Sequence, residues 1–230
     1  MLKNQFVNTE NVAGLRMVCE TFCNPSSILG PSLAVVTGPP GRGKTESAKY
    51  FSAHTNAIYV PPMTNRTPFM FAQEVVFEMT GEKPGRLSTC LDVIAREMVR
   101  ERRVIFVDEA DLLRFSILEM CRNMNERFTC PIVFIGESGL SGKLAKERRM
   151  VSRIRYSMEF GPISPADVSL YFEKAMNVRL SPSDITLIQR HSQGDWRPVL
   201  IIAISLDHAM TASDLTEVPE GLIRQIIHAQ

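Results

Sequence analysis

The chain has 230 residues, of which 44% are hydrophobic and 22% charged, and its formal net charge is +1. These values are ordinary for a globular protein with a large core, and the net charge alone does not indicate a nucleic-acid binder. No run of about 18 apolar residues is present, so we expect no membrane span, and the first residues, MLKNQFVNTEN, lack the apolar core of a signal peptide. We therefore expect a cytoplasmic protein.

The first part of the chain predicts helices that alternate with short apolar strands. A helix is expected from Glu10 to about Phe22, because Val12, Leu15 and Val18 give it an apolar stripe. The expected strands are at 33–36, 57–60, 104–107 and 132–135, with helices between them, among them 44–55, 67–80 and 87–101. This alternation predicts an α/β fold, in which a parallel sheet is covered by helices on both faces.

After about Phe160 the sequence predicts helices only. Ser164-Pro165 and Ser181-Pro182 are two similar helix starts, each with a capping serine, a proline in the first turn and an acid at the third position. Two more helices are expected near 197–210 and 220–229. We predict two domains, an α/β body over residues 1–160 and a small all-helical lid over residues 161–230.

The five cysteines predict neither a disulfide framework nor a zinc site. They are odd in number, scattered and without a C-x-x-C pair, and the four histidines lie far apart. We expect buried free thiols. The cysteines are Cys19, Cys23, Cys90, Cys121 and Cys130.

Residues 38–45, GPPGRGKT, lie between a predicted strand and a predicted helix. They match G-x-x-x-x-G-K-[ST], the Walker A pattern, in which glycines let backbone N–H groups point at phosphate oxygens. We expect Lys44 to reach the β- and γ-phosphates of ATP and the Thr45 hydroxyl to ligate Mg²⁺, with the positive end of the next helix at the phosphates. The expected nucleotide-binding residues are Gly38, Pro39, Pro40, Gly41, Arg42, Gly43, Lys44, Thr45 and Glu46.

Asp108 and Glu109 directly follow the apolar strand at 104–107. Ligands of parallel sheets bind at strand ends, so Asp108 is expected to organise Mg²⁺ and Glu109 to deprotonate the water that attacks the γ-phosphate. The alternative is a strand that ends in a charged turn. The separation of 63 residues from Thr45, with a βα pattern between, favours the catalytic interpretation.

GPPGRGKT together with VIFVDEAD resembles the AAA+ ATPases, a branch of the phosphate-loop proteins that forms rings or helices. The stretch PIVFIGES resembles the strand that carries sensor 1, which implies that Glu137, or alternatively Ser138, lies near the γ-phosphate. The family more often has Asn, Thr or Ser at that place. GDWR resembles the sensor 2 motif, which implies that Arg197 faces the phosphates; the alternative is that Arg197 pairs with Asp195 or caps a helix.

The stretch RRMVSRI resembles the segment that presents an arginine finger to a neighbouring subunit. This resemblance implies Arg153 as the finger, with Arg149 and Arg148 as alternatives. An arginine from the next subunit would make hydrolysis depend on assembly. The competing interpretation is a charge that faces solvent or DNA.

FVNTENVAGLRMVCETF and ILEMCRNMNERFTCPIVFIGESGL resemble the phage Mu transposition protein B group, and more loosely the IstB-type transposon ATPases. The resemblance implies an ATPase of the bacterial cytoplasm that forms a helical filament or ring on double-stranded DNA and has a transposase as its partner. The extra N-terminal DNA-binding region of the phage Mu protein is expected to be missing, because only 37 residues precede Gly38.

Polar and basic side chains in three stretches are candidates for sequence-independent contacts with DNA phosphates. Many weak contacts along one duplex would add up, which would reconcile DNA binding with a net charge of +1. The alternative is that these side chains are ordinary solvated residues. The candidates are Thr64, Asn65, Arg66, Arg114, Lys143 and Lys146.

Three other functions use the same nucleotide site. A helicase loader, or another replication-accessory ATPase, would grip a protein ring. A regulatory switch would have no DNA substrate. A metabolic phosphoryl transferase would need only the phosphate loop, whereas Glu109, Arg153 and Arg197 favour attack by water and coupling between subunits.

Overall fold

The computed structural model describes residues 5–24, 30–62 and 65–229 of the chain. A parallel sheet of five strands, in the order β2-β3-β4-β1-β5, organises its first part. The strands are β1 (Leu33–Thr37), β2 (Ile58–Val60), β3 (Ile105–Val107), β4 (Ile132–Ile135) and β5 (Ile154–Glu159). The predicted parallel sheet is confirmed, and β5 is an additional strand.

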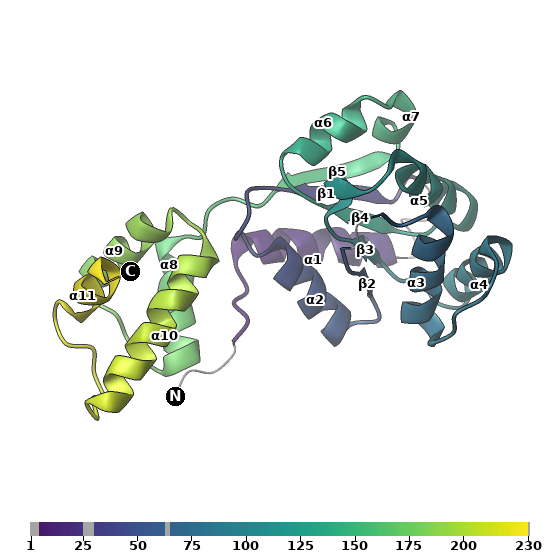
Figure 1. Ribbon diagram of the computed structural model, residues 1–230. Helices are drawn as coiled ribbons and strands as arrows, with labels where there is room; N and C mark the ends of the chain where they lie inside the picture. The colour runs from purple at the N-terminus through teal and green to yellow at the C-terminus, as the bar shows by residue number, and fades with distance from the viewer. Residues whose placement is uncertain (1–4, 25–29, 63–64, 230) are drawn as a thin grey trace. The chain divides into compact units, whose positions relative to one another are not determined.

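Helices connect the strands and cover both faces of the sheet. They are α1 (Glu10–Cys23), α2 (Lys44–His54), α3 (Pro68–Thr80), α4 (Leu87–Arg100), the 3₁₀ turn η2 (Ala110–Leu112), α5 (Phe115–Phe128), α6 (Gly139–Ala145) and α7 (Arg148–Val151). Figure 1 shows the strands between α1 and α2 on one side and α3, α4 and α5 on the other. Strands buried on both faces read as continuous apolar runs, which is why the sequence pattern identified four of them.

Alternate residues along each strand enter two different layers. Ile105 and Val107 of β3 share a buried cluster with Val75 of α3 and Ile94 of α4. Phe106, between them, stacks on Phe51 of α2 with ring centroids 6.3 Å apart. Side chains of a strand alternate between the two faces, so odd and even positions of β3 meet different helices.

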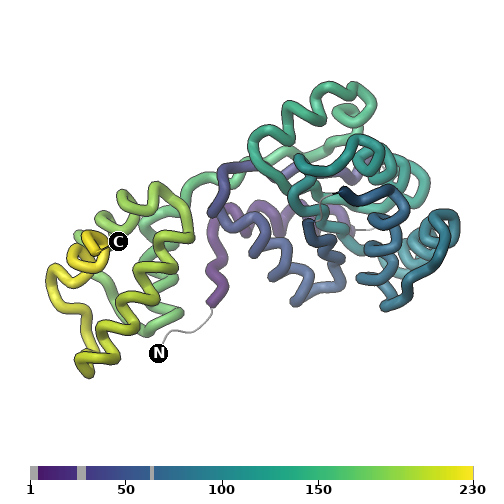
Figure 2. Tube along the Cα trace, in the orientation of Figure 1, coloured from purple at the N-terminus to yellow at the C-terminus, as the bar shows by residue number. Residues whose placement is uncertain are grey.

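The last part of the chain is all helical. It contains α8 (Pro165–Met176), α9 (Pro182–Ser192), α10 (Trp196–Ala212) and α11 (Leu222–His228). Ser164 and Ser181 cap the first two helices, and Ser164 forms a full capping box with Asp167. Figure 2 traces these helices as a small bundle with the C-terminus near α9 and α11.

Contacts within the chain divide it into two compact units. The body comprises residues 12–39 and 44–160. The helical unit comprises 1–11, 40–43 and 161–230. The helical unit has its own core, which includes Phe172, Ile188, Ile202 and Leu206. Among the described residues, no helix is both long and apolar enough to cross a membrane.

Candidate nucleotide-binding site

The loop after β1 has a backbone that requires glycine. Gly38, Gly41 and Gly43 have φ of 143°, 75° and 88°, values that other residues rarely adopt. A Cβ on Gly38 would lie 2.7 Å from the backbone oxygen of Phe160, also in the body. The glycines therefore let the chain turn tightly from the strand into α2, as a phosphate-binding loop requires.

Lys44 is the first residue of α2, and its side chain lies over the loop that precedes it. Its Nζ donates to the backbone oxygens of Gly38 at 2.7 Å and Pro39 at 2.8 Å, and only 9% of the residue is exposed. A buried ammonium needs such partners. The same position, at a helix N-terminus beside a glycine-rich loop, suits a cation that neutralises phosphate oxygens.

The end of β3 holds the two acidic residues that the sequence analysis singled out. Asp108 is 3% exposed, whereas Glu109 is exposed and has a left-handed φ of 47°. Asp108 Oδ1 accepts the backbone N–H of Glu109 at 2.9 Å, and Oδ2 accepts the hydroxyl of Tyr59 at 2.8 Å. The turn thus fixes one carboxylate and presents the other to solvent.

The end of β4 is tied to the turn that follows β3. The backbone N–H of Glu137 donates to Asp111 Oδ1 at 3.2 Å, and Lys143 Nζ donates to the backbone oxygens of Asp111, at 2.7 Å, and Leu113. The side chain of Glu137 is exposed, and Ser138 precedes α6. Because β3, β4 and β1 are neighbours in a parallel sheet, their carboxyl ends meet at one edge. This edge gathers the phosphate loop, Asp108 and Glu137.

The oxygen atoms at this edge suit a hard divalent cation. The Thr45 hydroxyl and the Asp108 carboxylate are the predicted ligands, and Mg²⁺ prefers few protein oxygens together with phosphate and water. Among the described residues, no three His, Cys, Asp or Glu side chains come together as a metal cluster. The donor set thus fits Mg²⁺ held jointly with nucleotide phosphates.

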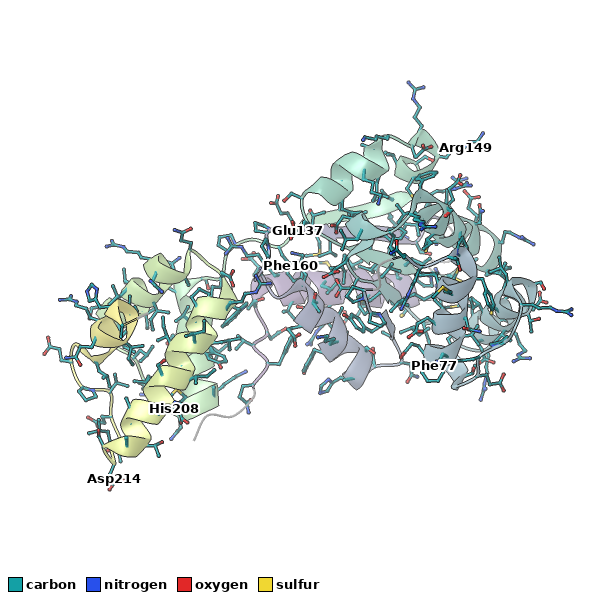
Figure 3. The ribbon with its side chains drawn as sticks, in the orientation of Figure 1. Phe77, Glu137, Arg149, Phe160, His208 and Asp214 are labelled. Atoms are coloured by element: carbon teal, nitrogen blue, oxygen red, sulfur yellow. The ribbon has the colours of Figure 1, made fainter. Side chains whose placement is uncertain are left out.

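Arg153, the predicted arginine finger, precedes β5 and is ion-paired within its own chain. Its Nε donates to Glu126 Oε1 at 2.7 Å, and Arg122 Nη1 donates to the same oxygen at 3.1 Å. The hydrogen bond from Arg153 lowers the pKa of the Glu126 carboxyl. The alternatives Arg148 and Arg149 are exposed in α7, and Figure 3 labels Arg149 at that helix.

Arg197 lies in the first turn of α10, in the helical unit. Its backbone N–H donates to Asp195 Oδ1 at 2.7 Å, so Asp195 caps the helix, and the Arg197 side chain is exposed. Within the same unit, the backbone N–H of Trp196 donates to the backbone oxygen of Gly41 at 3.0 Å. Arg42 Nη1 likewise donates to the backbone oxygen of Gln193 at 2.9 Å. Gly41 and Arg42 of the phosphate loop are therefore held by the residues that end α9 and begin α10.

The DNA-contact candidates differ in exposure. Arg114 and Lys146 are exposed, as is Asn65, which has a left-handed φ of 60°. Thr64 lies outside the described residues. Lys143 is half-buried by its bonds to the turn after β3.

The burial of Arg66 contradicts the expectation that this residue contacts DNA. It is only 2% exposed, and its Nε and Nη2 have no hydrogen-bond partner among the described residues. Burial lowers the pKa of its guanidinium, and the nearby Glu74 acts in the opposite direction. A side chain enclosed in this way does not present its charge to a DNA phosphate, so we no longer expect a contact there.

Sequence reasoning missed Tyr59. Its hydroxyl donates a hydrogen bond to Asp108. The sequence pattern predicted only a short apolar strand at this place and gave Tyr59 no role. The available signal was the alternation of side chains along the strand. Tyr59 pairs with Phe106 in the register of β2 and β3, and Asp108 follows Phe106 by two residues on the same face.

A glycine-rich loop after the first strand and acids after the third, in a sheet of this order, define a phosphate-loop α/β protein. A family model described as "AAA domain" matches residues 28–144, just over half of the chain. The chain belongs to this AAA domain family.

The chain is similar to the "ATP-dependent target DNA activator B" of Escherichia phage Mu, with 28% identity over 149 residues. This match covers 61% of the chain and 48% of the phage protein, so the chain spans about half the length of that relative. A "Potential ATP-binding protein" of Staphylococcus aureus is 22% identical over 97% of the chain and 96% of the relative. The predicted resemblance to the phage Mu transposition protein B group is confirmed.

A solved structure supports the fold. The ORC2 protein of Aeropyrum pernix, in complexes with ADPNP and ADP, superimposes with a TM-score of 0.68 at 14% identity. The superposition covers all of this chain and 69% of the ORC2 chain. At this identity the likeness shows the AAA+ fold alone, and it confirms the predicted fold class.

Proposed function

We propose that the protein is an ATPase that, with ATP bound, assembles on double-stranded DNA and activates a transposase. The observation that carries the proposal is the sheet edge, where the phosphate loop with Lys44 and the pair Asp108 and Glu109 meet. The similarity to a target DNA activator indicates the wider role. We place this activity in the bacterial cytoplasm.

The proposed reaction divides the work among separate side chains. Lys44 and the loop amides bind the phosphates, while Thr45 and Asp108 hold Mg²⁺. When bound, the ion neutralises charge on the phosphate oxygens. Glu109, exposed at its turn, takes the proton of the attacking water.

Assembly would complete the site. We propose that Arg153, or else Arg149 or Arg148, reaches the nucleotide of a neighbouring subunit in a helical filament or ring. Arg197 is proposed to face the phosphates, and Glu137 or Ser138 to act as the polar sensor near the γ-phosphate. Arg114, Lys146 and Asn65 remain candidates for DNA contacts.

The proposal is tested by binding of a fluorescent random-sequence duplex with ATP, with ADP and without nucleotide, across a salt series. We expect binding that requires ATP, ignores sequence and weakens steeply with salt. Such binding would make a search for a transposase that binds the DNA-bound protein the next step. No DNA binding in any nucleotide state would overturn the DNA part and favour a helicase loader or a switch.

Nucleotide binding can be measured separately from DNA binding, so the ATPase part and the DNA part of the proposal can be tested independently. Trp196 is the sole tryptophan, and a Cβ on Gly43 of the phosphate loop would lie 3.5 Å from its ring. We expect ATP to change the fluorescence of Trp196. An unchanged signal, together with no binding of labelled ATP, would overturn the ATPase assignment itself.

A further inference from the structure

Tyr59 lies on the same face of the sheet as Asp108. In β2, Ile58 and Val60 enter the buried cluster with α3 and α4, so the side chain between them points to the opposite face. That face is the one on which Phe106 stacks against Phe51 of α2, the helix that follows the phosphate loop. Tyr59 is thus directed to the same side of the sheet as α2, which begins at Lys44.

The hydroxyl of Tyr59 completes the set of donors to the Asp108 carboxylate. Oδ2 accepts this hydroxyl at 2.8 Å, and Oδ1 accepts the Glu109 N–H at 2.9 Å. A carboxylate with both oxygens bonded from different directions cannot rotate about its Cβ–Cγ bond without breaking one bond. Tyr59 supplies the side-chain half of this restraint.

Tyr59 is surrounded by apolar and acidic groups. Burial is the largest cause that raises the pKa of its hydroxyl, followed by the hydrogen bond to Asp108 and by the charges of Asp108, Glu46 and Glu109.

We propose that Tyr59 is a positioning residue for magnesium: it orients the Asp108 carboxylate from the neighbouring strand so that this carboxylate can serve the ion. The inference rests on the proposed Mg²⁺-dependent ATP site. A group that orients a metal ligand through a hydrogen bond typically changes metal affinity by about ten- to a hundredfold when removed.

A purely structural role makes a different prediction. Tyr59→Phe keeps the ring and its packing and removes only the hydroxyl. If the ring serves only to fill space, the variant differs from the wild type in thermal stability or not at all. If the hydroxyl positions Asp108, the dependence on Mg²⁺ changes while the affinity for metal-free ATP stays the same.

The test titrates Mg²⁺ into wild type and Tyr59→Phe with labelled ATP, and counts bound Mn²⁺ by electron paramagnetic resonance as a readout independent of hydrolysis. We expect Tyr59→Phe to need about tenfold more metal for half-saturation. Tyr156→Phe, in β5 beside Phe22, is the matched control and should behave as the wild type. A thermal melt checks that each variant is folded.

A second variant shows whether Tyr59 acts through Asp108. In an Asp108→Asn background, adding Tyr59→Phe should cause no further change in half-saturation by the metal. Equal metal dependence of wild type and Tyr59→Phe, or a full further loss in the Asp108→Asn background, would overturn the inference. A wild type that binds no ATP in the presence of metal would overturn the proposed function instead.

Discussion

The carboxyl edge of the sheet and the basic segment from Lys143 to Arg155 both concentrate charge, but they hold it differently. At the edge, Lys44 and Asp108 are 9% and 3% exposed and each forms at least two hydrogen bonds. In the segment, Arg149 and Arg155 are exposed. Buried charges must be paired to persist, whereas an exposed arginine is free to meet another molecule. This contrast agrees with the proposal that the edge carries out the chemistry and that the segment contacts partners.

The largest effect is expected at the phosphate loop. Lys44→Ala removes a charged donor, and bonds to charged groups contribute about 1.5–3 kcal/mol each, so ATP affinity should fall by about a hundredfold or more. Titration with labelled ATP measures this. Lys49→Ala, on the exposed side of the same helix, is the control. Unchanged ATP affinity in Lys44→Ala would show that the edge does not bind nucleotide.

The next effect separates binding from hydrolysis. Glu109→Gln removes the proposed base while it preserves the shape of the side chain and the backbone bond to Asp108. We expect unchanged ATP affinity and a fall in kcat of about a hundredfold or more, because positioned bases contribute about 10²–10⁴. Steady-state phosphate release, with Glu82→Gln as the control, measures it. Hydrolysis by Glu109→Gln at the wild-type rate would show that another residue is the general base.

A smaller effect tests the basic segment. The exposed ion pair of Arg153 with Glu126 should contribute at most about 1 kcal/mol to stability, so Arg153→Ala should fold normally. If Arg153 is the finger, the ATPase rate of the assembled protein should fall by about tenfold or more, with ATP binding by single chains unchanged.

The control for Arg153 comes from β5, the strand that follows it. Arg155→Ala removes an exposed charge two residues further on and should leave the assembled rate unchanged. If instead Arg149→Ala lowers the rate and Arg153→Ala does not, the finger lies in α7. If single chains hydrolyse ATP as fast as assemblies, no arginine of the segment serves a neighbour.

The same contrast explains what could be predicted from the sequence. The strands that lead into the phosphate loop and into Asp108 are buried on both faces, so their apolar runs are visible without tertiary information. The edge strand β5 alternates half-buried and exposed residues, so it shows no continuous apolar run. Arg66 was misjudged because a basic residue in a loop is usually solvated, and only the packing beside α3 decides its burial.

Residues that act through tertiary contacts were equally hidden. No local pattern shows that Tyr59 reaches Asp108, or that Lys143 turns back to the turn after β3, because these bonds span 49 and up to 32 residues. The ion pair between Arg153 and Glu126 spans 27 residues and was likewise invisible. Motif spacing identifies groups that meet the nucleotide, but it does not identify the groups that hold them.

The smallest expected effect divides the basic segment itself. Lys143 bonds two backbone oxygens of the turn after β3, whereas Lys146, three residues later, is exposed. Lys143→Ala should therefore lower the free energy of unfolding by about 1.5 kcal/mol, and Lys146→Ala should change it by less than about 0.5 kcal/mol. Urea denaturation measures both.

In DNA binding, Lys146→Ala should have the larger effect of the two variants. If Lys146 contacts a phosphate, its removal should reduce the slope of the salt dependence of binding by about one. Equal stability of the two variants would mean that Lys143 is as free as Lys146, and the distinction between held and available charge would then not extend into this segment.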